Sequence, residues 1–227
     1  MSNLKNGEQK KDASPCLILN HRKFNAARKK IVVIVLAGGQ SSRMGRDKAL
    51  IEVGGVPLLH KICAAAQSCA SSVYVIAPWV ARYQSILPTG CQCLTEVPQS
   101  GKTLPHGPLV AFAQALAQIE GEWVLLLACD LPYLTAEEMQ RWCHYLTQVP
   151  PTAIALLPRH LKGWEPLCGF YRRDCLTSLQ QFINGGGSSF QTWLAGNLVA
   201  ELSVTDSQLI LNCNTPQDLP EYQTMIT

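Results

Sequence analysis

The sequence IVVIVLAGGQSSRMGRDK, residues 31–48, is the most informative stretch for the fold class. It begins with seven consecutive apolar residues, Ile31–Ala37, most of which are β-branched. Such an unbroken run predicts a strand that is buried on both faces, as in the centre of a parallel sheet. Two adjacent glycines, Gly38 and Gly39, come next, so the strand is expected to lead into a glycine-rich turn.

The turn after this strand has the composition of a phosphate-binding loop. Adjacent glycines permit positive φ angles and let backbone N–H groups approach a phosphate closely. Arg43 and Lys48 follow in the same short loop and add two cations suited to a polyphosphate. The loop matches neither a Walker A nor a GxGxxG motif. A Gly-Gly turn alone is commonly just a tight connection, but this combination favours phosphate binding.

The remainder of the chain alternates strand-like and helix-like segments. Strands are predicted at 73–77, 123–128, 152–157, 166–171 and 209–211, and helices at 57–70, 79–87, 107–119, 174–183 and 190–194. A further helix is predicted to begin at Thr135, with Glu138 at the spacing of a capping box. This alternation predicts a single α/β domain with a mainly parallel sheet covered on both faces. Ligands of such sheets bind beyond the carboxyl ends of the strands.

Two acidic residues occupy such strand ends. Asp130 directly follows the apolar run WVLLLA, where a carboxylate can hold Mg²⁺ over the phosphates of a bound nucleotide. The alternative, that Asp130 caps the next helix, is weaker because Thr135 is the better cap. Glu96 ends another strand-like stretch and is a candidate for contact with the nucleotide, although acids at strand ends are often merely solvated.

Two asparagines, Asn212 and Asn214, follow the last predicted strand. Alternate positions of a strand share a face, so both amides are expected to point into the crevice. The neighbouring Thr215, Pro216 and Asp218 are accounted for as a helix start. The spacing leaves a substrate role for the two asparagines about as well supported as a plain structural one.

Composition and charge exclude several classes of protein. The 227 residues suffice for one sizeable domain, and 47% hydrophobic against 15% charged residues is enough to bury a core. No apolar run approaches the roughly 20 residues of a membrane span. Residues 1–30 hold eight Lys/Arg against two acids, a charge of +6, which leaves −3 for residues 31–227 of a chain whose net charge is +3. We expect a flexible basic tail at 1–30, a domain at 31–227, and neither a membrane nor a nucleic-acid partner.

The ten cysteines are scattered along the chain. They form no CxxC pair and no Cys/His cluster with zinc spacing, and Cys91 and Cys93 are the one close pair. Free thiols in a reducing cytosol explain this pattern better than a disulfide framework. Because the apolar run at 16–19 is too short for a secretory signal, we expect a cytoplasmic protein.

Taken in order, these motifs resemble the molybdenum cofactor guanylyltransferases, a family of the nucleotidyltransferase superfamily. The resemblance runs from Ile31 to about Tyr222 and rests on LAGGQSSRMGRDKA at 36–49, GGVPLL at 54–59, GPL at 107–109, CDLP at 129–132, EPLCGFYRR at 165–173 and NCNTPQDL at 212–219. The first motif is typical of the superfamily, and the last two are typical of the molybdenum-cofactor branch. Related cytidylyltransferases usually carry LAAG, so Gly38 followed by Gly39 favours guanine.

The resemblance implies a fold and a reaction. The fold would be a Rossmann-like three-layer α/β sandwich that binds GTP and Mg²⁺ at the carboxyl ends of the strands. The reaction would transfer GMP from Mg-GTP to the terminal phosphate of Mo-molybdopterin, forming Mo-molybdopterin guanine dinucleotide and pyrophosphate. GTP and Mo-molybdopterin are the implied small-molecule partners, and cofactor-insertion or acceptor molybdoenzyme proteins are the implied protein partners.

The resemblance also assigns roles by position. The catalytic residues would be Arg43, Lys48 and Asp130, of which Asp130 would also hold Mg²⁺. The nucleotide would be bound by Leu36, Ala37, Gly38, Gly39, Lys48, Glu96 and Asp130, and the pterin substrate would face Asn212 and Asn214. The chain departs from the family at Ile76 and Pro78, where relatives often carry Asn, and at Ser188 and Ser189, where many carry a basic pair.

The chemistry of the reaction agrees with this residue set. A phosphate monoester is largely ionised at neutral pH, since its second pKa is about 6, and it needs no general base to attack. The reaction needs charge neutralisation and in-line positioning instead. A glycine at position 38 is expected to leave room for a purine, which predicts GTP over CTP and ATP.

Two alternatives stay open from the sequence. One is a nucleotidyltransferase with another acceptor or base, such as a molybdopterin cytidylyltransferase or a sugar-phosphate nucleotidyltransferase. The other is a GTP- or cofactor-binding module that has lost catalysis, against which the intact set Arg43, Lys48 and Asp130 argues.

Overall fold

A seven-stranded sheet forms the centre of the protein in a computed structural model that describes residues 30–38, 47–98 and 106–219. The strand order is β11-β7-β10-β6-β1-β4-β5. The strands are β1 (Ile31–Leu36), β4 (Ser72–Ala77), β5 (Cys91–Thr95), β6 (Trp123–Ala128), β7 (Ala155–Leu157), β10 (Cys168–Arg172) and β11 (Val199–Glu201). Strands β6, β1, β4 and β5 run parallel, and β10 is antiparallel to both of its neighbours. The predicted mainly parallel α/β sheet is confirmed.

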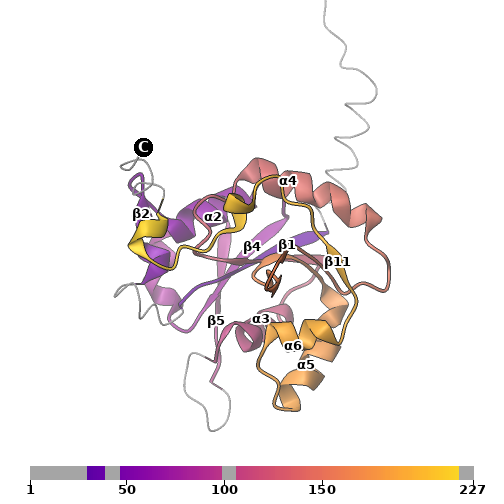
Figure 1. The fold of residues 1–227 in the computed structure, drawn as a ribbon. Coiled ribbons are helices and arrows are strands. Elements are labelled where there is room, and N and C mark those ends of the chain that lie inside the picture. The colour runs from indigo at the N-terminus through magenta and orange to yellow at the C-terminus, as the bar shows by residue number, and fades with distance from the viewer. Residues whose placement is uncertain (1–29, 39–46, 99–105, 220–227) are drawn as a thin grey trace, which may run out of the picture.

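Helices cover both faces of the sheet (Figure 1). Successive residues of β1 alternate between the two apolar cores: Val33 and Val35 pack on one side, and Val32 and Ile34 on the other. Helices α2 (Leu58–Ala66) and α4 (Ala136–Tyr145) complete the first core, and α3 (Pro108–Leu116), α5 (Leu176–Asn184) and α6 (Phe190–Ala195) complete the second. Because a central strand is covered on both faces, its sequence is continuously apolar, as predicted for 31–37.

Two predicted helices differ in detail from the structure. Helix α2 begins at Leu58, because Pro57 has an extended backbone and pairs with Glu52 in the small ladder of β2 (Glu52–Val53) and β3 (Val56–Pro57). The helix predicted at 79–87 is replaced by two 3₁₀ turns, Val80–Arg82 and Gln84–Ile86. Prolines at 78 and 88 bound this segment, and the residue before a proline is disfavoured in helical conformation.

The C-terminal part of the prediction was wrong in one element. The strand predicted at 209–211 is a 3₁₀ turn, Ser207–Ile210, which begins where the Asp206 side chain accepts the Gln208 N–H at 2.9 Å. The last strand is β11, which the sequence pattern does not predict. A hairpin of β8 (Arg159–His160) and β9 (Gly163–Trp164) also went undetected, since two-residue strands carry no readable periodicity.

Nine cysteines lie in the described ranges and all are free thiols. Within those ranges no helix is both long enough and apolar enough to cross a membrane.

Candidate active site

Three of the predicted site residues meet at the carboxyl edge of the sheet. The Lys48 ammonium donates to Asp130 Oδ2 at 2.7 Å and to Asn214 Oδ1 at 2.8 Å. These residues are 82 and 166 positions from Lys48 in the chain. The Lys48 and Asp130 side chains keep 16% and 14% of their surface exposed, so the pair is accessible from solvent.

Lys48 is held in place by a buried tyrosine. It begins a 3₁₀ turn, Lys48–Leu50, which Asp47 caps by accepting the Ala49 N–H at 3.1 Å. The other oxygen of Asp47 accepts the Tyr83 hydroxyl at 2.6 Å, and Tyr83 is fully buried. Burial, together with its hydrogen bond to Asp47, raises the pKa of Tyr83, so the phenol keeps its proton and donates. Asp47 and Tyr83 were missed in the sequence, where only the position of Asp47 before Lys48 hinted at a cap.

Asp130 is fixed through its backbone rather than by a helix. The Cys129 N–H donates to the Leu36 carbonyl at 3.1 Å, and the Cys213 N–H donates to the Asp130 carbonyl at 2.8 Å. The alternative that Asp130 caps α4 is wrong, because the Thr135 hydroxyl accepts the Glu138 N–H at that helix start. The Asp130 side chain is therefore directed by the end of β6 and faces Lys48.

Asn214 is presented by a tight turn. Asp218 accepts the backbone N–H groups of Thr215 at 2.7 Å and of Asn214 at 2.9 Å. The hydrogen bond from the Thr215 N–H is the main reason why the pKa of Asp218 is lowered. The carboxylate that shapes the turn therefore stays ionised. Cys213 is buried in a small apolar cluster with Ile51, Val53, Leu58 and Leu219, which ties this turn to the one that carries Lys48.

Asn212 has a different partner from Asn214. Its side chain faces the Glu165 carboxylate and lowers the pKa of that group. The prediction that both asparagines share one face of a strand was wrong, because the segment before them is a 3₁₀ turn. Both nevertheless line one pocket of about 610 Å³, together with Glu165 and residues of the β8–β9 hairpin such as Lys162 and Trp164.

The end of β1 lies beside the end of β6, which carries Asp130. The Ala37 N–H donates to the Ile76 carbonyl at 3.0 Å, and Leu36 accepts from Cys129. Gly38 has a φ of +87°, and a Cβ added there would lie 2.8 Å from Pro78 Cδ. The missing Cβ therefore makes room for Pro78, and the expectation that it also leaves space for a purine stays a prediction.

Of the remaining predicted site residues, the structure describes Glu96. Glu96 follows β5, two strands from β1, where it is 3% exposed and its Oε1 accepts the His106 N–H at 2.9 Å. This hydrogen bond joins residues on either side of 99–105, which lie outside the described residues, and within the described ranges no contact joins Glu96 to Lys48. Gly39 and Arg43 lie outside the described residues.

The cluster of Lys48, Asp130 and Asn214 suits a phosphate ligand with its own Mg²⁺. Within the described ranges no three His, Cys, Asp or Glu side chains are grouped so as to hold a metal by themselves. Mg²⁺ in proteins is commonly bound by one or two carboxylates and completed by substrate phosphates and water. One accessible carboxylate beside an ammonium group fits that mode of binding.

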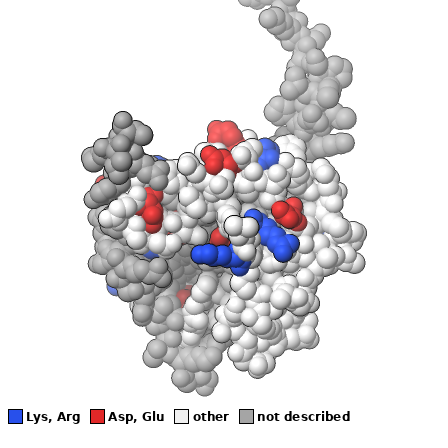
Figure 2. Space-filling model, viewed as in Figure 1, with Lys and Arg blue, Asp and Glu red and all other residues white. Residues whose placement is uncertain are grey.

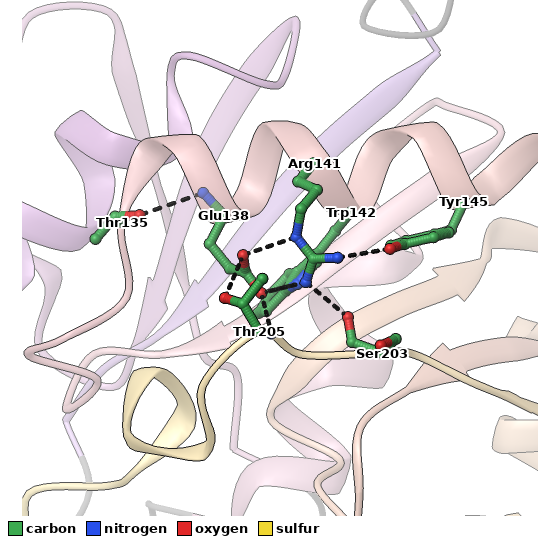
Figure 3. Close-up of polar contacts among 7 residues, drawn as sticks. All are labelled: Thr135, Glu138, Arg141, Trp142, Tyr145, Ser203 and Thr205. Carbon is green, nitrogen blue, oxygen red and sulfur yellow. Dashed lines mark hydrogen bonds and ion pairs between the residues drawn. The ribbon is translucent and has the colours of Figure 1, made fainter.

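A second polar cluster lies on α4 (Figure 3). The Glu138 carboxylate accepts from Arg141 Nε at 2.9 Å and Nη2 at 2.6 Å, from Trp142 Nε1 at 2.9 Å, and from the backbone and hydroxyl of Thr205 at 3.1 and 3.0 Å. Arg141 also donates to the Ser203 carbonyl at 2.9 Å. The expected capping box is thus only half formed, because the Glu138 carboxylate binds these groups instead of the Thr135 N–H. Through these hydrogen bonds, the segment at 203–205, which precedes Asn212 and Asn214 in the chain, is held against α4.

Comparison with known proteins agrees with this architecture. Residues 33–201 match the family described as "MobA-like NTP transferase domain". A Nostoc protein named "Probable molybdenum cofactor guanylyltransferase" is 54% identical over 85% of this chain and 90% of its own length, and one of the same name from Synechococcus elongatus is 43% identical over 84% and 96%. The crystal structure of molybdopterin-guanine dinucleotide biosynthesis protein A from Archaeoglobus fulgidus shares the fold, with a TM-score of 0.67 at 20% identity, over 86% of this chain and 98% of that one.

Proposed function

The chain belongs to the MobA-like NTP transferase family, among its molybdenum cofactor guanylyltransferases, and from this premise we propose that Lys48, Asp130 and Asn214 form its reaction centre. The protein transfers GMP from GTP to the terminal phosphate of Mo-molybdopterin and releases pyrophosphate. The observation that carries the proposal is the contact of Lys48 with both Asp130 and Asn214 at the carboxyl edge of the sheet.

The reaction demands charge stabilisation more than proton transfer. An oxygen of the acceptor phosphate attacks the α-phosphorus of GTP, and the bond from that phosphorus to the bridging oxygen of the leaving pyrophosphate breaks. The acceptor is largely ionised at neutral pH, so no residue has to remove a proton. What accelerates the step is a fixed positive charge near the transferred phosphoryl group and the departing oxygens.

Lys48 supplies this charge from the protein. Its ammonium lies where the strand ends meet, and Asp47 with Tyr83 fixes the turn that carries it. Asp130 is the residue that would hold Mg²⁺, which when bound neutralises phosphate charge. Leu36, Ala37 and Gly38 border this centre and are assigned to the nucleotide, as are Gly39 and Glu96, and Arg43 is assigned to the phosphates on sequence grounds.

The pocket beside Asn214 is assigned to the acceptor. Its volume of about 610 Å³ is within the usual range for small-molecule sites. Asn212 and Asn214 lie on its wall, and Lys162 contributes a positive charge. Figure 2 shows Lys and Arg side chains, with Asp and Glu side chains beside them, near the centre of one face of the molecule, between the positions of α4 and α6 in Figure 1. A positive side chain such as Lys162 favours an acceptor that carries a phosphate.

A competition assay tests the proposal. Mo-molybdopterin is incubated with Mg²⁺ and equal concentrations of GTP, CTP and ATP, and the dinucleotide products are separated by chromatography. The expected product is the guanine dinucleotide, formed by the wild-type protein and not by Lys48→Ala. Formation of the cytosine dinucleotide in equal or greater amount would move the protein to the cytidylyltransferases.

A further inference from the structure

A carboxylate in the acceptor pocket is unexpected. The acceptor is anionic and would be repelled by a nearby negative charge. Glu165 nevertheless lines the pocket, keeps 20% of its side chain exposed and lies close enough to Asp130 for the two charges to interact. Asp130 has a role in binding Mg²⁺, whereas Glu165 has none in the transfer chemistry.

Glu165 differs from the buried carboxylate of Glu138, which is saturated by the protein. The partners of Glu165 are the Asn212 side chain and His160 Nε2, the latter at a long 3.7 Å. Burial raises the pKa of Glu165, and these two partners offset the effect only in part. For Glu138 the hydrogen bonds outweigh burial and lower the pKa to about 2. A carboxylate so weakly supplied with donors, in the wall of a pocket, is suited to accept hydrogen bonds from a ligand.

The acceptor carries the matching donors. One edge of a pterin ring presents an N–H and an adjacent amino group, two parallel donors that a single carboxylate can accept together. We propose that Glu165, oriented by Asn212, recognises this donor edge of the pterin and so selects the acceptor of the transfer reaction. The inference rests on the proposed function and adds a specificity-determining residue to it.

Asn212 has a positioning role in this arrangement. Its side chain lowers the pKa of the Glu165 carboxylate and lines the same pocket, so it is placed to orient the side chain that reads the pterin. Asn214, two residues on, contacts Lys48 instead. In this arrangement the two asparagines serve different parts of the acceptor. Asn214 lies at the phosphate, and Asn212 lies at the pterin.

The test uses two heterocycles that differ at this edge. Binding of 6-hydroxymethylpterin and of 6-hydroxymethyllumazine, in which an oxygen replaces the amino group, is measured by fluorescence titration of the full-length protein. Because a buried acceptor left facing an oxygen is penalised strongly, the wild-type protein should prefer the pterin by about tenfold or more. Glu165→Gln should lose most of this preference, and Glu201→Gln, an exposed glutamate of β11, should keep it.

Transfer kinetics separate this inference from the proposed function. Glu165→Gln should raise KM for Mo-molybdopterin about tenfold while KM for GTP and kcat change little, because a lost substrate contact weakens binding alone. A wild-type protein that binds neither heterocycle, or both equally, overturns the inference even if GMP transfer proceeds. An altered Mg²⁺ requirement of Glu165→Gln with its pterin preference intact would make Glu165 a metal ligand and also overturn it. Absence of GMP transfer in the wild-type protein would instead overturn the proposed function.

Discussion

The ion pair at the proposed reaction centre and the ion pair on α4 differ in how the protein surrounds them. Lys48 and Asp130 are 2.7 Å apart, and Arg141 and Glu138 are 2.6 Å apart. Both pairs contact the C-terminal segment, through Asn214 in one case and through Ser203 and Thr205 in the other. Distance and sequence position alone do not distinguish a catalytic pair from a structural one.

The difference lies in how completely each carboxylate is satisfied. Glu138 is 5% exposed and accepts five hydrogen bonds from the protein, two of them from the planar fork of Arg141. Asp130 is bound by Lys48, whose ammonium is a point charge on a flexible stem and can turn to a phosphate. A saturated carboxylate stabilises the fold, whereas one paired with an adaptable cation can exchange that partner for a ligand.

The largest effect is expected from Asp130→Asn. A neutral amide is a much poorer Mg²⁺ ligand than a carboxylate, so GMP transfer should fall below detection while the melting temperature changes by only a few degrees. Activity is measured over a range of Mg²⁺ concentrations. Full activity at saturating Mg²⁺ would show that Asp130 is not part of the reaction centre. The proposed difference between the Lys48–Asp130 pair and the Arg141–Glu138 pair would then be wrong.

Lys48→Ala is expected to have the second-largest effect. Loss of one preorganised charge at a developing negative charge costs about 10²–10³ in kcat. Steady-state kinetics with GTP and Mo-molybdopterin measure the loss. Lys61→Ala on α2 is the control, because it leaves the contacts of Lys48 with Asp130 and Asn214 intact. A decrease below about threefold would show that Lys48 is an ordinary surface residue.

Glu138→Gln should act on stability and not on chemistry. Removing one partner of a buried pair costs about 3–5 kcal/mol, and because Arg141 is 31% exposed we expect roughly 2–3 kcal/mol. Chemical denaturation measures the free energy of unfolding, with Glu137→Gln, an exposed neighbour on α4, as the matched control. Transfer activity measured well below the melting temperature should persist. An inactive but stable Glu138→Gln protein would make this cluster part of the reaction centre.

The smallest effect is a pH dependence. Burial raises the pKa of Glu138, but hydrogen bonds from Arg141, Thr205 and Trp142 together lower it from 4.5 to about 2. The resulting stabilisation is present above pH 4.5 and is lost as the pH falls towards 2. The stability difference between wild type and Glu138→Gln should therefore shrink between pH 6 and pH 3. An unchanged difference would show that the Glu138 charge is not what stabilises the cluster.

Much of the sheet and of the reaction centre could be predicted because both follow from local patterns. Runs such as 31–37 and 123–128 are apolar throughout only when both faces are covered, and parallel strands must end at a common edge. That rule predicted Lys48 and Asp130 at the same edge of the sheet, where the structure shows them in contact. Asn214 was placed there too, although the strand invoked to explain it does not exist.

The remainder depends on contacts that no local pattern records. Tyr83 lies in an unremarkable segment, and its role follows only from the Asp47 carboxylate 36 residues away. Glu138 has the spacing of a capping box, but donors from residues 203–205 compete successfully for its carboxylate. Gly38 could be predicted as a residue of special conformation, whereas the neighbour that requires it, Pro78, could not.

The fate of the phosphates of GTP tests the central claim most directly. Wild type, Glu138→Gln and Asp130→Asn are each incubated with Mo-molybdopterin, Mg²⁺ and GTP labelled at either the α- or the γ-phosphate. We predict that wild type and Glu138→Gln place the α-label in the dinucleotide and the γ-label in pyrophosphate, and that Asp130→Asn leaves both labels in GTP. A γ-label on the acceptor, or equal transfer by Asp130→Asn, would contradict a guanylyltransferase centred on Lys48 and Asp130.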